Sequence, residues 1–304
     1  MTLRTLLVGG TGFVGRHLAR QLADRYEIVV SGRGEDIRDA AVMRALVTRA
    51  RPDLVVNLAA LTTVRETFQS PRETYEVGLI GLLHVFEALK SHGFRGRFLE
   101  ISSSEVYGLV PAERLPIAET DPLRPESPYS VAKIAAEGLC YQWHKSEGLD
   151  VRIARPFTHI GPGQSERFSV AHFVRQIAEI MARTREPAIH VGDLTTTRDL
   201  TDVRDVVRAY DTILHAGEAG EIYNICSDRE TLMRDVLDEL IRLSGLPIAV
   251  IENQGLLRRT EQRHLRGSYA ALAGKTGWKP EIPLASTLRD MLEYALKSVA
   301  GGPR

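Results

Sequence analysis

Tyr129 and Lys133 stand four residues apart in a segment whose residue types are typical of a helix start. Ser127 suits the N-cap, and Pro128 suits the first helical position, where its missing N–H would lack a partner anyway. At this spacing the phenol and the ammonium share one helix face, and the cation favours the phenolate. Such a pair can give a proton to a carbonyl or take one from an alcohol. Because the spacing also arises by chance on helix surfaces, the other motifs must decide whether the pair is catalytic.

A glycine-rich turn near the start of the chain lies between a predicted strand and a predicted helix. A short apolar run ends at Gly9, after which Gly12 and Gly15 follow at three-residue spacing. Gly9 permits a tight turn, and Gly12 lets the backbone approach a pyrophosphate at the positive end of the helix. Gly15 allows the helix to pack closely on the strand. This context predicts a dinucleotide-binding turn.

The end of the second predicted strand, residues 27–31, indicates which nicotinamide cofactor is bound. NAD-binding folds usually place a carboxylate here to bond the ribose 2′-hydroxyl. This sequence continues instead into a serine, a glycine and Arg33, which could pair with a 2′-phosphate. We therefore expect NADP(H) to be favoured, with NAD(H) still possible, and Asp36 and Ile37 to lie near the adenine ring.

Strands and helices alternate through the first half of the chain. This alternation predicts an α/β fold of the Rossmann type, with a doubly wound parallel sheet that binds ligands at the carboxyl ends of its strands. The expected strands after the first two cover residues 54–58, 98–101 and 150–154, and the expected helices cover 41–49, 73–91 and 128–147.

A hydroxyl-rich turn at residues 102–108 follows one of these strands. Such a turn can simply bond its own backbone. It comes, however, about twenty residues before the Tyr129 helix and at an edge of the sheet where ligands bind. We expect its hydroxyls to bond a substrate oxygen beside the tyrosine.

A proline- and glycine-rich run at residues 155–164 marks a boundary, beyond which the regular alternation loosens. We expect residues 1–160, with 201–226 returning to them, to form the cofactor-binding domain. Residues 161–200 and 227–304 are expected to form a smaller, mostly helical domain that binds the substrate.

The composition is that of an ordinary soluble globular protein. The 304 residues are 43% hydrophobic, and the 39 Lys and Arg balance the 39 Asp and Glu, so no net charge favours nucleic acid or a membrane as a partner. Cys140 and Cys226 lie in apolar contexts far apart, which indicates buried thiols rather than a disulfide or a metal site. No secretory signal or membrane span is evident, so a cytoplasmic location is expected.

With these motifs in register, the sequence resembles the extended short-chain dehydrogenase/reductase family over nearly its full length, and within it the nucleotide-sugar branch. The motifs that carry the resemblance are the glycine turn, Asn57 to Ala60, Ser102 to Gly108, the Tyr129–Lys133 pair, Arg155 to Gln164, Arg198 to Val203, Tyr223 to Ser227, Arg259 to Arg263 and Thr276 to Pro280.

The resemblance implies reduction of a C4 ketone on a nucleotide-linked 4-keto-6-deoxy-hexose, with a GDP-linked sugar favoured. Tyr129 would donate the proton, Lys133 would support it and orient the nicotinamide ribose, Ser103 would bond the C4 oxygen, and Glu105 stands at a possible acid–base position. The implied cofactor contacts are Gly9, Gly12, Phe13, Val14, Gly15, Arg33, Asp36, Ile37, Leu58, Ala59, Ala60, Tyr129, Lys133, Pro156 and Phe157.

The substrate contacts implied by the resemblance lie mostly in the second half: Ser104, Thr158, Arg198, Arg259, Glu261 and Arg263. Arginines bind a diphosphate in bidentate fashion, and a glutamate can accept from a guanine edge. Two positions depart from the family pattern. Gly78 replaces an asparagine that helps order a water beside the lysine, and Thr158 replaces an asparagine after the Arg-Pro-Phe segment.

Several alternatives stay open at this point. Glu105 is also compatible with a GDP-mannose 4,6-dehydratase, whose acid moves protons at C5 and C6. A dTDP-linked substrate, an epimerase and a non-catalytic NADP-binding sensor are further alternatives. The resemblance also implies a homodimer, in which the helices around residues 73–91 and 128–147 pair with their mates in a four-helix bundle.

Overall fold

The computed structural model describes residues 2–32, 34–61, 63–253 and 262–300. Within them, six strands form one parallel sheet in the order β10-β5-β4-β3-β1-β2. The strands are β1 (Arg4–Val8), β2 (Glu27–Val30), β3 (Leu54–Asn57), β4 (Arg97–Ile101), β5 (Asp150–Pro156) and β10 (Ile222–Ile225). The strand order reverses beside β1, as in a doubly wound sheet, so the predicted fold class is confirmed.

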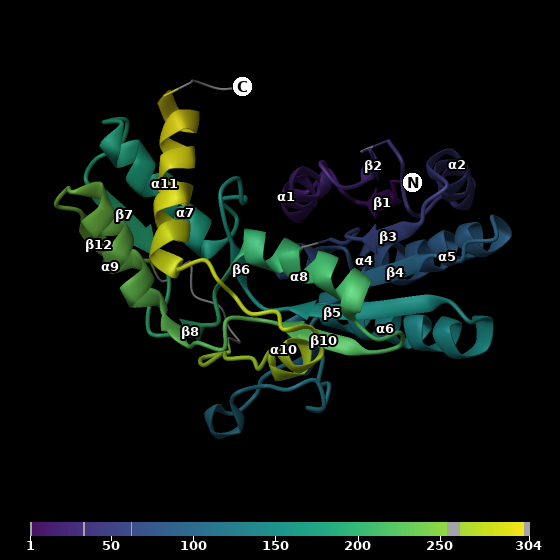
Figure 1. Cartoon of the computed structure of the whole chain (residues 1–304). Coiled ribbons are helices and arrows are strands. Elements are labelled where there is room, and N and C mark those ends of the chain that lie inside the picture. Colours follow the sequence, from purple (N-terminus) through teal and green to yellow (C-terminus); the bar gives the residue numbers. More distant parts are fainter. Residues whose placement is uncertain (1, 33, 62, 254–261, 301–304) are drawn as a thin grey trace.

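Helices cover both faces of the sheet (Figure 1). Each face has its own apolar core, because nearly every side chain of β1, β3 and β4 is buried on one side or the other. One face carries α2 (Ala40–Ala50), α5 (Gly81–Ser91) and α6 (Pro128–Glu147), and the other carries α1 (Phe13–Leu22), α8 (Val203–Ala216) and α10 (Ala270–Thr276).

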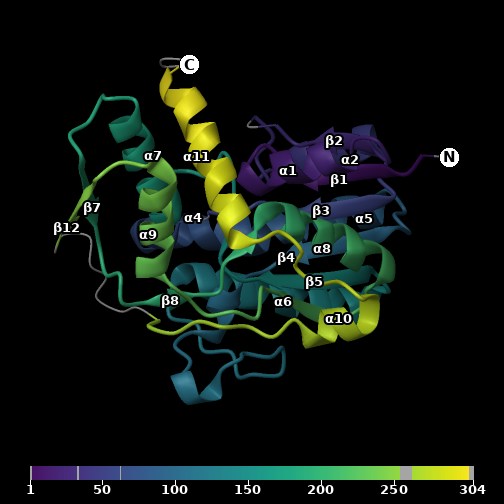
Figure 2. The same cartoon turned by 60° about the vertical axis from the view of Figure 1, so that its left-hand side comes forward.

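A third apolar cluster lies beside the sheet, at the left of Figure 1 and of the turned view in Figure 2. Its helices pack on one another and on a small parallel pair of strands. The members are α7 (Ser169–Met181), α9 (Met233–Ser244), α11 (Leu284–Ala300), β7 (Ala188–Val191) and β12 (Ala249–Glu252). This cluster confirms the smaller, mostly helical part expected from the sequence.

Short elements connect these layers. Two two-residue strand pairs join the sheet to the helical cluster, and short helices precede α5 and α6. They are α3 (Val64–Gln69), α4 (Pro71–Tyr75), η1 (Glu76–Ile80), η2 (Ser104–Tyr107), η3 (Ala112–Arg114), β6 (His159–Ile160), β8 (Thr197–Arg198), β9 (Thr201–Asp202) and β11 (Thr231–Leu232).

The helix expected at residues 73–91 is interrupted. Its middle part, η1, is a π-helical turn between α4 and α5. Gly78 lies in this turn, and a Cβ there would stand 3.0 Å from the Ala132 Cβ of α6. The glycine therefore lets η1 lie close against α6.

Cys140 and Cys226 are buried and unpaired, as the sequence predicts. Burial raises the pKa of both thiols, so they pack as small apolar side chains. Among the helices that the structure describes, none has the length and apolar composition needed to cross a membrane.

Candidate active site

Helix α6 begins where the sequence predicts. The Ser130 N–H donates to Ser127 Oγ at 3.1 Å, and the Ser127 N–H donates to Ser130 Oγ at 3.0 Å, which is a reciprocal capping box. Pro128 occupies the first helical position. Because this cap fixes the first turn, Tyr129 and Lys133 lie one turn apart at the start of α6.

Lys133 is buried between α6 and the sheet. Its Nζ donates to the Ile101 carbonyl at 2.5 Å and lies 3.4 Å from Glu100 Oε1, both at the carboxyl end of β4. Burial by itself would lower the pKa of Lys133, but the Glu100 carboxylate and the Tyr129 phenol outweigh it and raise that pKa. Lys133 is therefore an ammonium beside the half-buried Tyr129.

The three serines after β4 have different surroundings. Ser102 Oγ donates to Glu137 Oε1 at 2.5 Å, so its proton is already used in a buried hydrogen bond. Ser103 is buried and caps η2, because its Oγ accepts from the Glu105 N–H at 3.2 Å. Ser104 is half-buried, and Glu105 is exposed. The geometry leaves Ser103 and Ser104 as candidates for a substrate oxygen, and their roles stay predictions.

The glycine turn has the tight geometry that the sequence predicts. Gly9 has φ +72°, and a Cβ on it would lie 2.8 Å from Ala59 Cα. A Cβ on Gly15 would lie 2.2 Å from the Gly10 carbonyl oxygen. α1 begins directly after Gly12, and no side chain caps it. Its first N–H groups can therefore bind a phosphate.

The side chains that follow these glycines lie between the sheet and the boundary segment. Phe13, Val14 and Leu58 are partly buried against the core under α8. The Phe13 ring is parallel to the His159 ring, with 6.3 Å between centroids. Ala60, at the end of the predicted cofactor segment, is half-buried.

The region after β2 contains a carboxylate, although the sequence was interpreted as placing no acid there. Glu35 Oε2 accepts from the Gly32 N–H at 2.7 Å, and Glu35 Oε1 lies 2.7 Å from Arg49 Nη1. The hydrogen bond from Arg49 lowers the pKa of Glu35, so this acid is ionised. Arg33, predicted to bind a 2′-phosphate, lies outside the described residues.

The two residues expected near the adenine differ in exposure. Asp36 is partly exposed and binds Arg38 at 2.6 Å. Ile37 is buried, and its side chain packs so closely on α5 that a Cβ on Gly81 would meet it at 2.7 Å. Asp36 is therefore accessible to a ligand, whereas Ile37 belongs to the apolar core next to it.

The end of β5 continues into the boundary segment without a break in bonding. Pro156 ends β5, and the Phe157 N–H donates to the Ile225 carbonyl at 2.8 Å. The Phe157 ring is buried in a small core of its own. The Thr158 backbone carbonyl accepts from the Thr201 N–H at 3.0 Å, and this bond does not involve the Thr158 side chain, which is half-buried.

A buried network of charges supports the site from below. Arg155 forms two hydrogen bonds with Glu137 of α6, at 2.9 and 2.6 Å, and donates to Tyr107 OH at 2.9 Å. Tyr107 OH donates to Asn224 Oδ1 at 2.7 Å. Burial raises the pKa of Tyr107 to about 12, so its hydroxyl stays protonated. The network ties α6 to β5, β10 and the serine turn.

Of the charged residues predicted to contact the substrate, the structure describes Arg198 and Arg263. Arg198 Nη1 donates to the Gln262 carbonyl at 2.9 Å, and Arg263 Nη1 lies 3.6 Å from Asp193 Oδ2 with its side chain exposed. Arg198 and Arg263 are thus brought to one region between the sheet and the helical cluster. The remaining two predicted contacts, Arg259 and Glu261, lie outside the described residues.

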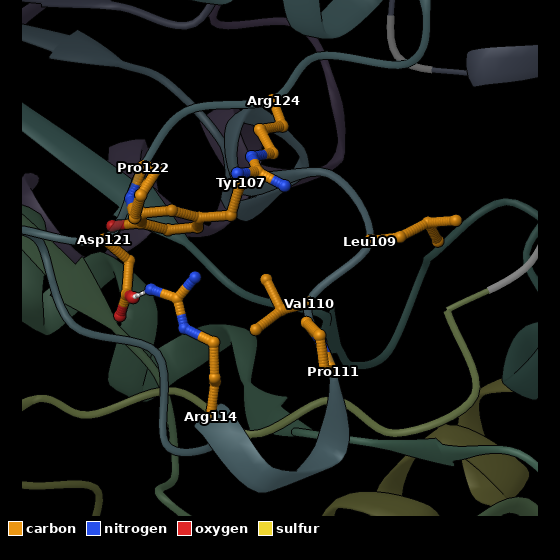
Figure 3. Close-up of a pocket in the computed structure, with 8 residues that line it drawn as sticks. All are labelled: Tyr107, Leu109, Val110, Pro111, Arg114, Asp121, Pro122 and Arg124. Carbon is orange, nitrogen blue, oxygen red and sulfur yellow. Dashed lines mark hydrogen bonds and ion pairs between the residues drawn. The ribbon is translucent and has the colours of Figure 1, made fainter.

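Two surface hollows flank Val110 and Pro111 in the segment between η2 and α6. In the smaller one, shown in Figure 3, Arg114 bonds Asp121 at 2.6 Å and faces the buried Tyr107. Gln262 joins this segment to the predicted substrate region, because its side-chain amide bonds both backbone groups of Val110. Tyr129 lines neither hollow.

Two buried acids near the catalytic pair, Glu100 on β4 and Glu137 on α6, were not predicted from the sequence, and Asn57 was named there only as part of a motif. Asn57 and Glu100 are opposite one another in the β3–β4 register, and Asn57 Nδ2 donates to Glu100 Oε2 at 2.7 Å. For Asn57 and Glu100, the available signal was a polar residue inside a buried strand. Buried polar groups of this kind need partners, and so point to a site.

The parallel sheet, the glycine turn at β1–α1 and the Ser/Tyr/Lys set at β4 and α6 are together those of NAD(P)-dependent short-chain dehydrogenases/reductases. A family model described as GDP-mannose 4,6 dehydratase matches residues 33–291, and the chain belongs to that family. The resemblance to the nucleotide-sugar branch is thereby confirmed.

Two relatives and one solved structure define the likeness further. A GDP-6-deoxy-D-mannose reductase of Pseudomonas aeruginosa is 41% identical, over 96% of this chain and 97% of its own. The structure of RMD from Pseudomonas aeruginosa complexed with NADPH has a TM-score of 0.91 and 40% identity, covering 97% of this chain and 99% of that one. A GDP-mannose 4,6-dehydratase of Yersinia enterocolitica is 28% identical, over 84% of this chain and 76% of its own.

Replacing Arg155 by Met is expected to lower the free energy of unfolding by about 3–5 kcal/mol, because Glu137 would stay buried without its partner. Urea unfolding followed by circular dichroism measures this loss. The matched control is Arg242→Met, which removes an exposed pair with Glu239 and should change stability little. Equal effects of the two variants would contradict a supporting role for the buried network.

Proposed function

We propose that the protein reduces the C4 ketone of GDP-4-keto-6-deoxy-D-mannose with NADPH and forms GDP-D-rhamnose. The observation that carries the proposal is the end-to-end match to a GDP-6-deoxy-D-mannose reductase. The placement of Tyr129, Lys133 and Ser103 around the carboxyl end of β4 supports the same chemistry.

The residues present fit a nicotinamide dinucleotide. The turn before α1 offers uncapped N–H groups for the pyrophosphate, and the missing Cβ atoms of Gly9 and Gly15 allow its tight path. NADP(H) is the favoured form, because the solved relative is complexed with NADPH and Arg33 follows β2. Bound there, NADPH supplies the hydride that reaches C4 of the sugar.

The chain itself handles the proton. Tyr129 donates its phenolic proton to the oxygen that becomes the C4 alcohol, and the Lys133 ammonium one turn away stabilises the phenolate left behind. Ser103, held by its η2 cap, bonds the same oxygen and fixes its position. We assign Ser104 and Thr158 to the sugar.

The nucleotide diphosphate is assigned to the arginines of the second half. Arg198 and Arg263 lie in one region of the described structure, and Arg259 and Glu261 stand within three residues of Gln262 in the sequence. We assign Glu261 to the guanine edge. We also assign cofactor binding to residues 1–160 with 201–226, and substrate binding to 161–200 with 227–304.

The main alternative is a GDP-mannose 4,6-dehydratase. Two observations favour it: Glu105 is exposed next to the serine turn, and one relative of this activity is 28% identical. The two activities are separable by assay. A dehydratase converts GDP-mannose without added NADPH, whereas the proposed reductase leaves it unchanged and oxidises NADPH only with the 4-keto sugar.

Replacing Tyr129 by Phe should lower kcat for NADPH oxidation with the 4-keto sugar by about 10²–10⁴-fold, because the proton donor is lost. NADPH binding, followed by its fluorescence, should be retained. Tyr141→Phe is the control, since it removes the same hydroxyl from an exposed tyrosine of the same helix. Near-normal turnover by the Tyr129 variant would overturn the assignment.

We infer that the protein acts in the cytoplasm as a homodimer built on a four-helix bundle. Large apolar side chains are exposed on the packed helices that would form it, with Tyr141 61% exposed and Ile80 42% exposed. Sedimentation should give twice the chain mass of 33.8 kDa for the wild type. Tyr141→Glu should shift the mass towards the monomer, whereas Tyr294→Glu on α11 should not; a monomeric wild type would refute the dimer.

A further inference from the structure

Glu100 is a buried carboxylate that the proposed chemistry has not yet used. It lies at the carboxyl end of β4 and is 1% exposed. Its two oxygens point to different partners, since Oε1 lies 3.4 Å from Lys133 Nζ and Oε2 accepts from Asn57 at 2.7 Å. Asn57 Oδ1 in turn accepts from the Ala59 N–H at 3.3 Å, in the segment assigned to the cofactor.

An ammonium at this depth needs an anion beside it. Removing a charge from water disfavours it strongly, so a buried lysine without a partner gives up its proton. The Ile101 carbonyl holds one Nζ–H of Lys133, but a neutral carbonyl supplies no charge. Gly78 on the opposing η1 turn offers no side chain, and Ala132 fills the space next to it.

The other titratable groups around Lys133 have partners or carry no charge. Glu137 of α6 is bound to Arg155, and the buried Cys140 keeps its proton because burial raises its pKa. Tyr129 is the proposed proton donor, and burial raises the pKa of Tyr210 on α8, which therefore keeps its proton. Burial raises the pKa of Glu100, but the Lys133 ammonium and the hydrogen bond from Asn57 act against this and favour the carboxylate. Among the described residues, Glu100 is therefore the acid that pairs with the charge of Lys133.

We propose that Glu100 is a positioning residue of the catalytic pair, whose carboxylate keeps Lys133 protonated and holds its Nζ at the end of β4. The proposal rests on the proposed function only in so far as Lys133 supports Tyr129. Through Asn57, the same carboxylate also connects the lysine to the backbone at Ala59, so that cofactor segment and catalytic lysine share one hydrogen-bonded chain.

The pH profile of kcat/KM for the keto sugar tests the proposal. The active state has both Tyr129 and Lys133 protonated, and a nearby negative charge favours the protonated form of either group. Replacing Glu100 by Gln should therefore move the basic limb to lower pH by about one unit or more, whichever group loses its proton first. Glu147→Gln removes an exposed acid from α6, the helix of Lys133, and should leave the basic limb in place. An unshifted limb in Glu100→Gln would overturn the proposal.

A second measurement requires neither turnover nor a folded Glu100 variant. The chain has six lysines, so the 13Cε signals of lysine-labelled wild-type protein can be titrated individually, with Lys133 assigned by its loss in Lys133→Arg. Lys133 should keep its proton to higher pH than the exposed lysines. Titration at or below their pH would overturn the role of Glu100, while a lack of activity with the keto sugar would overturn only the proposed function.

Discussion

The pairing of buried charges between α6 and the sheet is the constraint on which the site depends. Arg155 and Glu137 form a bidentate ion pair out of contact with water, and Lys133, one turn earlier on the same helix, lies beside Glu100. Burying a charged group costs free energy unless an opposite charge lies beside it. Each buried ion therefore holds its partner in one geometry. The result is a helix whose first turn cannot shift along β4 without leaving a charge unpaired.

The fixed position of α6 sets where Tyr129 and Lys133 lie relative to the serine turn. The capping box sets the start of α6, and the ion pairs set its position, so Tyr129 is presented beside the Ser103 turn. The cofactor turn at α1 lies at the same edge of the sheet because parallel strands end together. In the proposed reaction these side chains supply a proton donor, a cation beside it and a hydroxyl that holds the oxygen, while the cofactor supplies the hydride.

The sequence predicted the parts of this arrangement that depend on local spacing. The glycines before α1 and the Tyr129–Lys133 pair each lie within one turn or helix, and the alternation of strands and helices predicted the sheet. The contacts of Lys133 with Glu100 and of Arg155 with Glu137 join residues 33 and 18 positions apart. Neither pairing has a periodic signature, so both required the fold. The close packing of Gly78 on Ala132 of α6 likewise joins residues far apart in the sequence, and the π-helical turn there was not predicted.

The most direct test of the account is to follow the transferred hydrogen. GDP-4-keto-6-deoxy-D-mannose is incubated with the purified protein and NADPH that carries deuterium at its transferable position, and the product is examined by NMR. The account predicts GDP-D-rhamnose with one deuterium at C4 for each NADPH oxidised. A product without deuterium at C4, or conversion of GDP-mannose in the absence of NADPH, would contradict it.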